Sequence, residues 1–117
     1  MGLFGLRRRT RSGTLRGASS TDIAHLAQFV KSRRGVEAFI EPRTAVTETT
    51  VVLVAATGEW TRRRVAGVGG ARDFARKHGV PLYDVAVVGY PQRMRDWTAK
   101  RKANGELGPP GLSGPSV

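Results

Sequence analysis

The sequence predicts an α+β domain whose elements follow the order α-β-β-β-α-β-α. Three observations predict this class: apolar residues recur at helical spacing in three stretches, β-branched or alternating residues fill four others, and Gly or Pro separates them. The chain has 117 residues, 39% of them apolar, which suits one domain with one small core. We expect a small, mostly antiparallel sheet with the helices packed on one of its faces.

Local signals mark the first helix and the first strand. Ser19 or Ser20 can cap a helix that ends before Gly35. Residues 36–41 then alternate in character until Pro42 ends the run, which predicts a strand with one polar face. The apolar face of the helix carries Ile23, Leu26, Ala27 and Val30.

A hairpin is predicted in the middle of the chain. Residues 49–55 are β-branched and nearly continuous, which indicates a strand that is buried on both faces and central in the sheet. Thr57 and Gly58 supply a tight turn into a strand at residues 59–65.

A second helix, a fourth strand and a last helix complete the order. The second helix has Phe74 on its apolar face and ends at Gly79. A strand is predicted over residues 82–88, and Pro91 begins a helix over residues 92–103.

Both ends of the chain differ in composition from the middle. Residues 1–18 carry five arginines, no acidic residue and no periodic apolar face, so we expect a disordered basic arm. Residues 104–117 are rich in Gly and Pro and are expected to form a flexible tail. Residues 19–103 form the single α+β domain and hold 15 basic against 8 acidic residues, so the basic character extends beyond the arm.

Charge and composition restrict the partners. The net charge of +11 and the pI of about 11.5 predict a polyanionic partner, although Arg outnumbers Lys 16 to 4, a bias that a GC-rich genome also produces. Without cysteine, disulfides, thiolate nucleophiles and Cys-based metal sites are excluded. The short apolar start and the lack of a long apolar run predict no export and no membrane span, so we expect a cytoplasmic protein.

The strongest candidate site is the run from Trp60 to Arg64. Alternation along a strand sends Trp60, Arg62 and Arg64 to one face and Arg63 to the other. Trp60 can lie under a guanidinium or stack with a base, and arginines two residues apart match the spacing of adjacent phosphates. The alternative is that arginines on an edge strand only prevent association between sheets.

The second candidate is a glycine-rich loop that opens the second helix. Gly67, Gly69 and Gly70 leave backbone N–H groups free at a helix start, and Arg72 adds a full charge, so a phosphate can bind there. The spacing matches neither GxGxxG nor a Walker loop, so we expect no nucleotide cofactor. The alternative is a plain connection from strand to helix.

Arginines of the arm and of the last helix complete the candidate contacts to nucleic acid: Arg7, Arg8, Arg9, Arg11, Arg93 and Arg95. Tyr83, Tyr90 and Trp97 are interleaved with basic residues, a pattern that suits base stacking. The alternative is that Met94 and Trp97 pack the last helix onto the sheet.

The α-β-β-β-α stretch of residues 19–79, with a glycine loop and a basic residue at the start of its second helix, resembles the layout of double-stranded RNA-binding domains. The resemblance implies phosphate contacts at that helix start. That family has a lysine cluster there, whereas this chain offers Arg72, Arg76 and Lys77, with Asp73 among them.

The order α-β-β-β-α-β also resembles the core of restriction-endonuclease-like nucleases. That resemblance implies acidic Mg²⁺ ligands on the second and third strands and a lysine two residues after the last acid. Residues 49–57 contain no carboxylate, and Thr61 stands two residues after Glu59, so these catalytic residues are missing. His25 and His78 lie on different predicted helices, and we predict no metal or hydrolytic site.

Three stretches, residues 29–41, 50–64 and 83–95, together with the start MGLFG and its arginine cluster, resemble a family of small basic actinobacterial proteins of unknown function. The resemblance covers most of the core and implies no activity.

We therefore expect a protein without enzymatic activity that binds RNA or the ribosome, with DNA as a further possibility, through contacts between arginines and phosphates. The alternative is a protein–protein interaction module whose arginines only solvate its surface. A third possibility, an enzyme with a bound cofactor, would show as colour or bound nucleotide in the purified protein. We expect no cofactor and no metal, and the sequence leaves the oligomeric state open.

Overall fold

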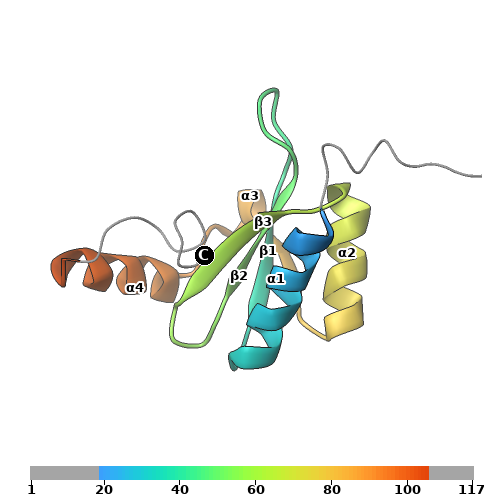
Figure 1. Cartoon of the computed structure of the whole chain (residues 1–117). Coiled ribbons are helices and arrows are strands. Elements are labelled where there is room, and N and C mark those ends of the chain that lie inside the picture. The colour runs from blue at the N-terminus through green and yellow to red at the C-terminus, as the bar shows by residue number, and fades with distance from the viewer. Residues whose placement is uncertain (1–18, 106–117) are drawn as a thin grey trace, which may run out of the picture.

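A four-stranded mixed sheet lies at the centre of the computed structural model, which describes residues 19–105 (Figure 1). The α+β class and the order of the predicted elements are confirmed. The predicted arm (residues 1–18) and residues 106–117 of the predicted tail lie outside the described residues. The elements are α1 (Ser20–Ser32), β1 (Glu37–Glu41), β2 (Thr50–Val54), β3 (Trp60–Arg64), α2 (Gly67–His78), β4 (Leu82–Asp84), α3 (Val85–Val88) and α4 (Gln92–Ala103).

The strands lie in the order β3-β2-β1-β4. β1 pairs antiparallel with β2, and β2 pairs antiparallel with β3. β4 instead pairs parallel with β1, and α2 supplies the crossover connection that a parallel pair requires. The strand predicted to be central, β2, is central, and β3 and β4 form the two edges.

One face of the sheet is covered by α1 and α2, which lie side by side in Figure 1. Leu26 and Phe29 of α1 and Phe74 of α2 share a buried cluster with Val51 and Leu53 of β2. Full burial of side chains of this size contributes about 1.5–3 kcal/mol each relative to exposure, so this cluster is the larger part of the core.

The opposite face of the sheet is covered as well, by α3, the segment before α4 and the first turns of α4. Phe39, Val52, Val54, Trp60 and Met94 form a second buried cluster there. The expectation that the helices pack on one face is therefore wrong. Its physical reason is that β1 and β2 carry apolar side chains on both faces, and a bare second face would leave Phe39, Val52 and Val54 in water.

Capping interactions fix the ends of the two helices on the first face. The Ser19 Oγ accepts a hydrogen bond from the Asp22 N–H at 3.0 Å, and the Asp22 carboxylate accepts one from the Ser19 N–H at 3.3 Å, which completes a capping box. Gly79 ends α2 in the left-handed conformation, with φ of 67°, as the sequence predicts.

The fourth strand is shorter than the predicted range of residues 82–88. β4 stops at Asp84, whose carboxylate accepts a hydrogen bond from the Ala86 N–H at 2.8 Å and caps the one-turn helix α3. Because the chain turns away at this cap, Val87 and Val88 are 80% and 55% exposed instead of lying in the sheet.

The turn between β2 and β3 approaches α4 closely at Gly58. Its φ is +97°, and a Cβ placed on it would lie 2.1 Å from the Arg93 carbonyl oxygen. A side chain at this position would therefore strain the turn and push α4 away from the sheet.

We predict that Gly58→Ala lowers the free energy of unfolding by about 2–4 kcal/mol, because the left-handed backbone and the contact with α4 both resist a Cβ. Urea denaturation measures this change. Gly69→Ala is the matched control, since nothing lies within 4 Å of a Cβ there, and it is expected to stabilise α2 by up to about 1 kcal/mol. Equal effects of the two substitutions would contradict the close approach of the turn to α4.

Candidate nucleic-acid interface

Some of the described arginines are paired with carboxylates, and others are exposed without an ion pair to residues 19–105. An arginine of the first kind must give up its carboxylate to contact a phosphate, which costs stability. Ion pairs within residues 19–105 involve Arg33, Arg62, Arg63, Arg76 and Arg93.

Arg62 lies on the second face of the sheet, as alternation predicts, and is held by Glu41. Its Nε and a terminal nitrogen donate to the two carboxylate oxygens at 2.8 and 3.0 Å, a bidentate pair. Thr50 Oγ1 donates to the same carboxylate at 2.6 Å, and the Tyr90 hydroxyl also donates to it. Glu41 thus joins β1, β2, β3 and the segment before α4.

This network shifts the pKa values of its members. Burial raises the pKa of Glu41, but hydrogen bonds from Arg62, Thr50 and Tyr90 outweigh burial and hold it below 4.5. Burial and the hydrogen bond to Glu41 raise the pKa of Tyr90. At neutral pH the cluster therefore holds a charged carboxylate, a charged guanidinium and a neutral phenol.

Trp60 lies beneath Arg62, with 5.3 Å between the Arg62 Cζ and the ring centroid. This is one of the two arrangements that the sequence predicts for the ring. Its Nε1–H donates to Thr98 Oγ1 at 2.9 Å, and the residue is only 6% exposed. Because the ring packs against α4, stacking on a base would require α4 to move, so Trp60 is not available as a stacking platform.

Arg63 and Thr61 lie on the opposite face, toward α1. Arg63 Nε is 3.6 Å from an Asp22 oxygen, and Thr61 Oγ1 lies 2.7 Å from His25 Nε2. Burial, followed by the charges of Arg63 and Arg33, lowers the pKa of His25. His25 is therefore neutral at pH 7 and able to share a hydrogen bond with the threonine hydroxyl.

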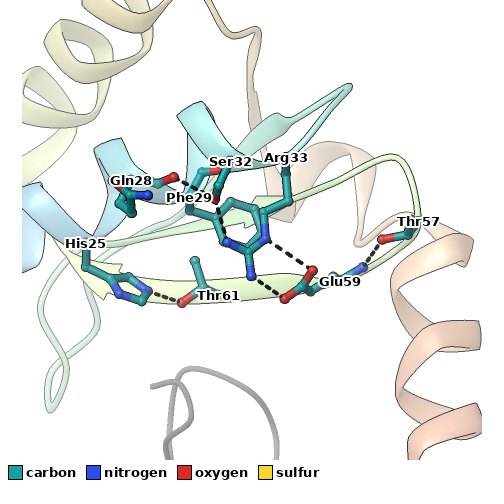
Figure 2. A network of polar contacts seen from close by, with 8 residues as sticks. All are labelled: His25, Gln28, Phe29, Ser32, Arg33, Thr57, Glu59 and Thr61. Carbon is teal, nitrogen blue, oxygen red and sulfur yellow. Dashed lines mark hydrogen bonds and ion pairs between the residues drawn. The ribbon is translucent and has the colours of Figure 1, made fainter.

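On the same face of the sheet, a network of polar contacts joins the C-terminal end of α1 to β3 (Figure 2). Arg33 donates to both oxygens of Glu59 at 3.1 and 2.6 Å and to the Ser32 Oγ at 2.6 Å. Its guanidinium also lies 4.5 Å from the centroid of the Phe29 ring. The hydrogen bond to Glu59 raises the pKa of Arg33. These contacts attach the C-terminal end of α1 to the start of β3.

Arg93 attaches α4 to the end of β2. Its Nε donates to the Ala55 carbonyl at 2.9 Å, and a terminal nitrogen donates to Glu37 Oε1 at 2.7 Å and to the Val54 carbonyl at 3.3 Å. Arg95 is instead exposed and donates to the Gln92 side chain at 3.1 Å. Of the two candidates on α4, only Arg95 faces solvent.

Two exposed arginines lie at the end of the sheet where β1 and β3 finish, and a third is exposed on the following helix α2. The register places Glu41 opposite Thr50 and Thr50 opposite Arg64, so Arg64 lies at the same end as the loop of residues 42–49. The structure shows no ion pair of these three arginines with residues 19–105. The three, here called the Arg64 cluster, are Arg43 in that loop, Arg64 at the end of β3 and Arg72, which is the sixth of the twelve residues of α2 and not, as predicted, in its first turn.

The start of α1 lies at this end as well, because Asp22 of α1 contacts Arg63 of β3. Residues 1–18 join the domain there. The candidates Arg7, Arg8, Arg9 and Arg11 themselves lie outside the described residues.

Gly69 and Gly70 lie inside α2, whereas the sequence predicts a loop in front of the helix. α2 begins at Gly67, and its N-cap Ala66 makes no side-chain hydrogen bond. A Cβ at Gly67 or Gly69 would meet nothing within 4 Å. The open helix start adjoins the Arg64 cluster, since Gly67 follows Arg64 by three residues.

Arg43 is the member of the cluster that the sequence pattern does not single out. It is an isolated arginine in a loop, and its position matters only because the pairing of β1 with β2 brings that loop to the end of β3. The signal that points to it is its place directly after Pro42, which ends the first predicted strand.

Within residues 19–105 no group of three or more His, Asp or Glu side chains is placed to hold a metal ion. None of the helices in that part of the chain combines the length and apolar character of a membrane span. Comparison of the chain with protein-family models, with curated proteins and with solved structures finds no significant match.

We predict that Glu41→Gln lowers the free energy of unfolding by about 1–3 kcal/mol at pH 7, because Arg62 keeps its half-buried position without a charged partner. The pKa of Glu41 is below 4.5 in the folded chain, so its contribution is complete above pH 4.5 and is lost as the pH falls through the folded value. Urea denaturation across acidic pH values is expected to show the difference between wild type and variant shrinking.

Asp73→Asn is the control for this variant. It removes the 2.6 Å pair between Asp73 and Arg76, in which both side chains are largely exposed, and is expected to change stability by less than about 0.5 kcal/mol. Comparable losses in the two variants would contradict a special role of the Glu41 network.

Proposed function

We propose that the protein binds nucleic acid, with RNA as the preferred partner, through phosphate contacts made by the Arg64 cluster and by the arginines of residues 1–18. The observation that carries the proposal is the division of the arginines. Arg43, Arg64 and Arg72 are exposed and have no ion pair with residues 19–105, and Arg43 and Arg64 lie at the end of the sheet where residues 1–18 join the domain.

An exposed guanidinium suits a phosphate because its planar set of donors matches two phosphate oxygens at once. The arm and the cluster together contain eight arginines, and Glu48 is the acidic residue of the 42–49 loop. The covalent attachment of this arm at residue 19, close to Arg63, supports an interface at this end of the domain.

The preference for RNA rests on the resemblance to double-stranded RNA-binding domains. α1 and α2 cover one face of the antiparallel β1, β2 and β3, and the loop between β1 and β2 projects beyond the sheet at the end where α2 starts (Figure 1). β4 and α4 depart from that layout. A cytoplasmic, non-enzymatic role at RNA or the ribosome belongs to the same proposal.

We predict that Arg43→Gln, Arg64→Gln and Arg72→Gln together weaken binding to RNA. Fluorescence anisotropy at several salt concentrations, with single-stranded RNA, duplex RNA and duplex DNA, measures the effect. For four to six phosphate contacts the log-log salt slope of the wild type is expected at about −3 to −5, and the triple variant is expected to lose about 2–3 of it.

The matched control removes the same charge at the other ends of α1 and α2 through Lys31→Gln, Arg34→Gln and Lys77→Gln. These side chains are exposed and form no ion pair with residues 19–105. Thermal unfolding establishes that both triple variants are folded. If the two variants lose the same affinity, the Arg64 cluster is not the interface, and equal affinity for the three nucleic acids would contradict the preference for RNA.

A protein partner is the second candidate, and one observation favours it. Tyr83 of the edge strand β4 and Val87 and Val88 of the following helix α3 are exposed, and exposed apolar side chains of this kind mark contact surfaces. A defined oligomer by light scattering, lost on Val87→Ser and Val88→Ser and unaffected by RNA, would favour this role over nucleic-acid binding.

A further inference from the structure

An apolar groove of about 340 Å³ follows one side of α4. Its lining residues recur at three- and four-residue spacing, so they form one stripe along the helix. Between Gln92 and Lys102 this stripe is about 15 Å long at a rise of about 1.5 Å per residue. The lining consists of Tyr90, Met94, Arg95, Thr98, Ala99 and Lys102.

The polar side-chain atoms of Tyr90 and Thr98, which line the groove, already have partners. The Tyr90 hydroxyl donates to Glu41, and Thr98 Oγ1 accepts from the Trp60 indole. Met94 is buried in the second cluster. The surface left for a ligand is therefore the apolar strip of the groove, with two exposed cations in its lining, Arg95 and Lys102.

We propose that residues 106–112 of the same chain dock in this groove. The segment begins where the groove ends: α4 stops at Ala103, and Gly105 has a φ of 82°, a left-handed conformation that reverses the direction of a chain after a helix. Leu107 and Leu112 can then lie against Met94 and Ala99.

The composition and length of the segment fit the groove. Residues 106–112 contain two leucines, a Pro-Pro pair, one acid and no base. Proline pairs favour the polyproline II conformation, and seven residues in it span about 19 Å, which is enough to run back along the stripe. Proline-rich segments bind grooves lined by aromatic and apolar side chains in the same way.

Charge favours the same occupant. Glu106 is the next acidic residue after Asp96, and it follows Lys102 by four residues. The apolar lining argues against a phosphate backbone in this groove. Because the segment is covalently attached next to the groove, its effective concentration is in the millimolar range, and a weak contact suffices to keep it docked.

The direct test is proton NMR of the full chain, with nuclear Overhauser effects sought between the methyl groups of Leu107 or Leu112 and those of Met94 or Ala99. The proposal expects these effects within one chain. A sample that mixes isotope-labelled and unlabelled chains separates the alternatives: effects between chains mean that a second copy fills the groove, and either that result or no effect at all overturns the proposal.

A second measurement uses substitutions in the same full chain. Leu107→Ser with Leu112→Ser is expected to uncover the stripe and raise the fluorescence of a bound anilinonaphthalene sulfonate dye about threefold. Pro115→Ser with Val117→Ser changes two apolar residues outside the docked segment and is expected to leave the dye signal unchanged. Equal signals from both variants overturn the proposal, and neither measurement depends on nucleic-acid binding.

Discussion

The central strands of the sheet are apolar on both faces, and the rest of the structure depends on this constraint. Val51 and Leu53 of β2 lie in one buried cluster, and Val52 and Val54 lie in the other. A chain of this size buries a smaller share of its surface than a larger protein does, so each of the two clusters makes up a large part of its buried apolar area. α1 and α2 therefore cover one face, while α4 is fixed to the other by its Met94 and by hydrogen bonds from Arg93 and Trp60.

Much of the positive charge serves this architecture. Arg33, Arg62 and Arg93 each join two elements through a carboxylate, and each pair is partly buried, where its geometry matters more than its net energy. The count of 20 Lys and Arg residues therefore overstates the number of cations that are free to meet a ligand. Arg34, Arg43, Arg64 and Arg72 remain exposed and have no ion pair with residues 19–105.

The sequence predicts the elements whose signals are local. Ser19, Gly79 and Pro91 mark helix ends by their own backbone chemistry, and alternation assigns Arg62 and Arg63 to opposite faces. The parallel pairing of β4 with β1 and the packing of α4 on the second face depend on contacts between residues far apart in the chain, which no local pattern encodes. The same holds for the candidate site. Arg62 pairs with Glu41, whereas Arg64 has no carboxylate partner in residues 19–105, and this difference follows from strand register alone.

Both tryptophans of the chain belong to the second face. Trp60 is buried against α4, and Trp97 packs on the same cluster with Arg101 4.8 Å from its ring centroid. Tryptophan fluorescence therefore reports on the packing of α4 against the sheet and not on the layer formed by α1 and α2. Circular dichroism, in contrast, averages over all helices. The two tryptophans therefore report on only one of the two helical layers. Comparing tryptophan fluorescence with circular dichroism during unfolding shows whether the two layers unfold together or in sequence.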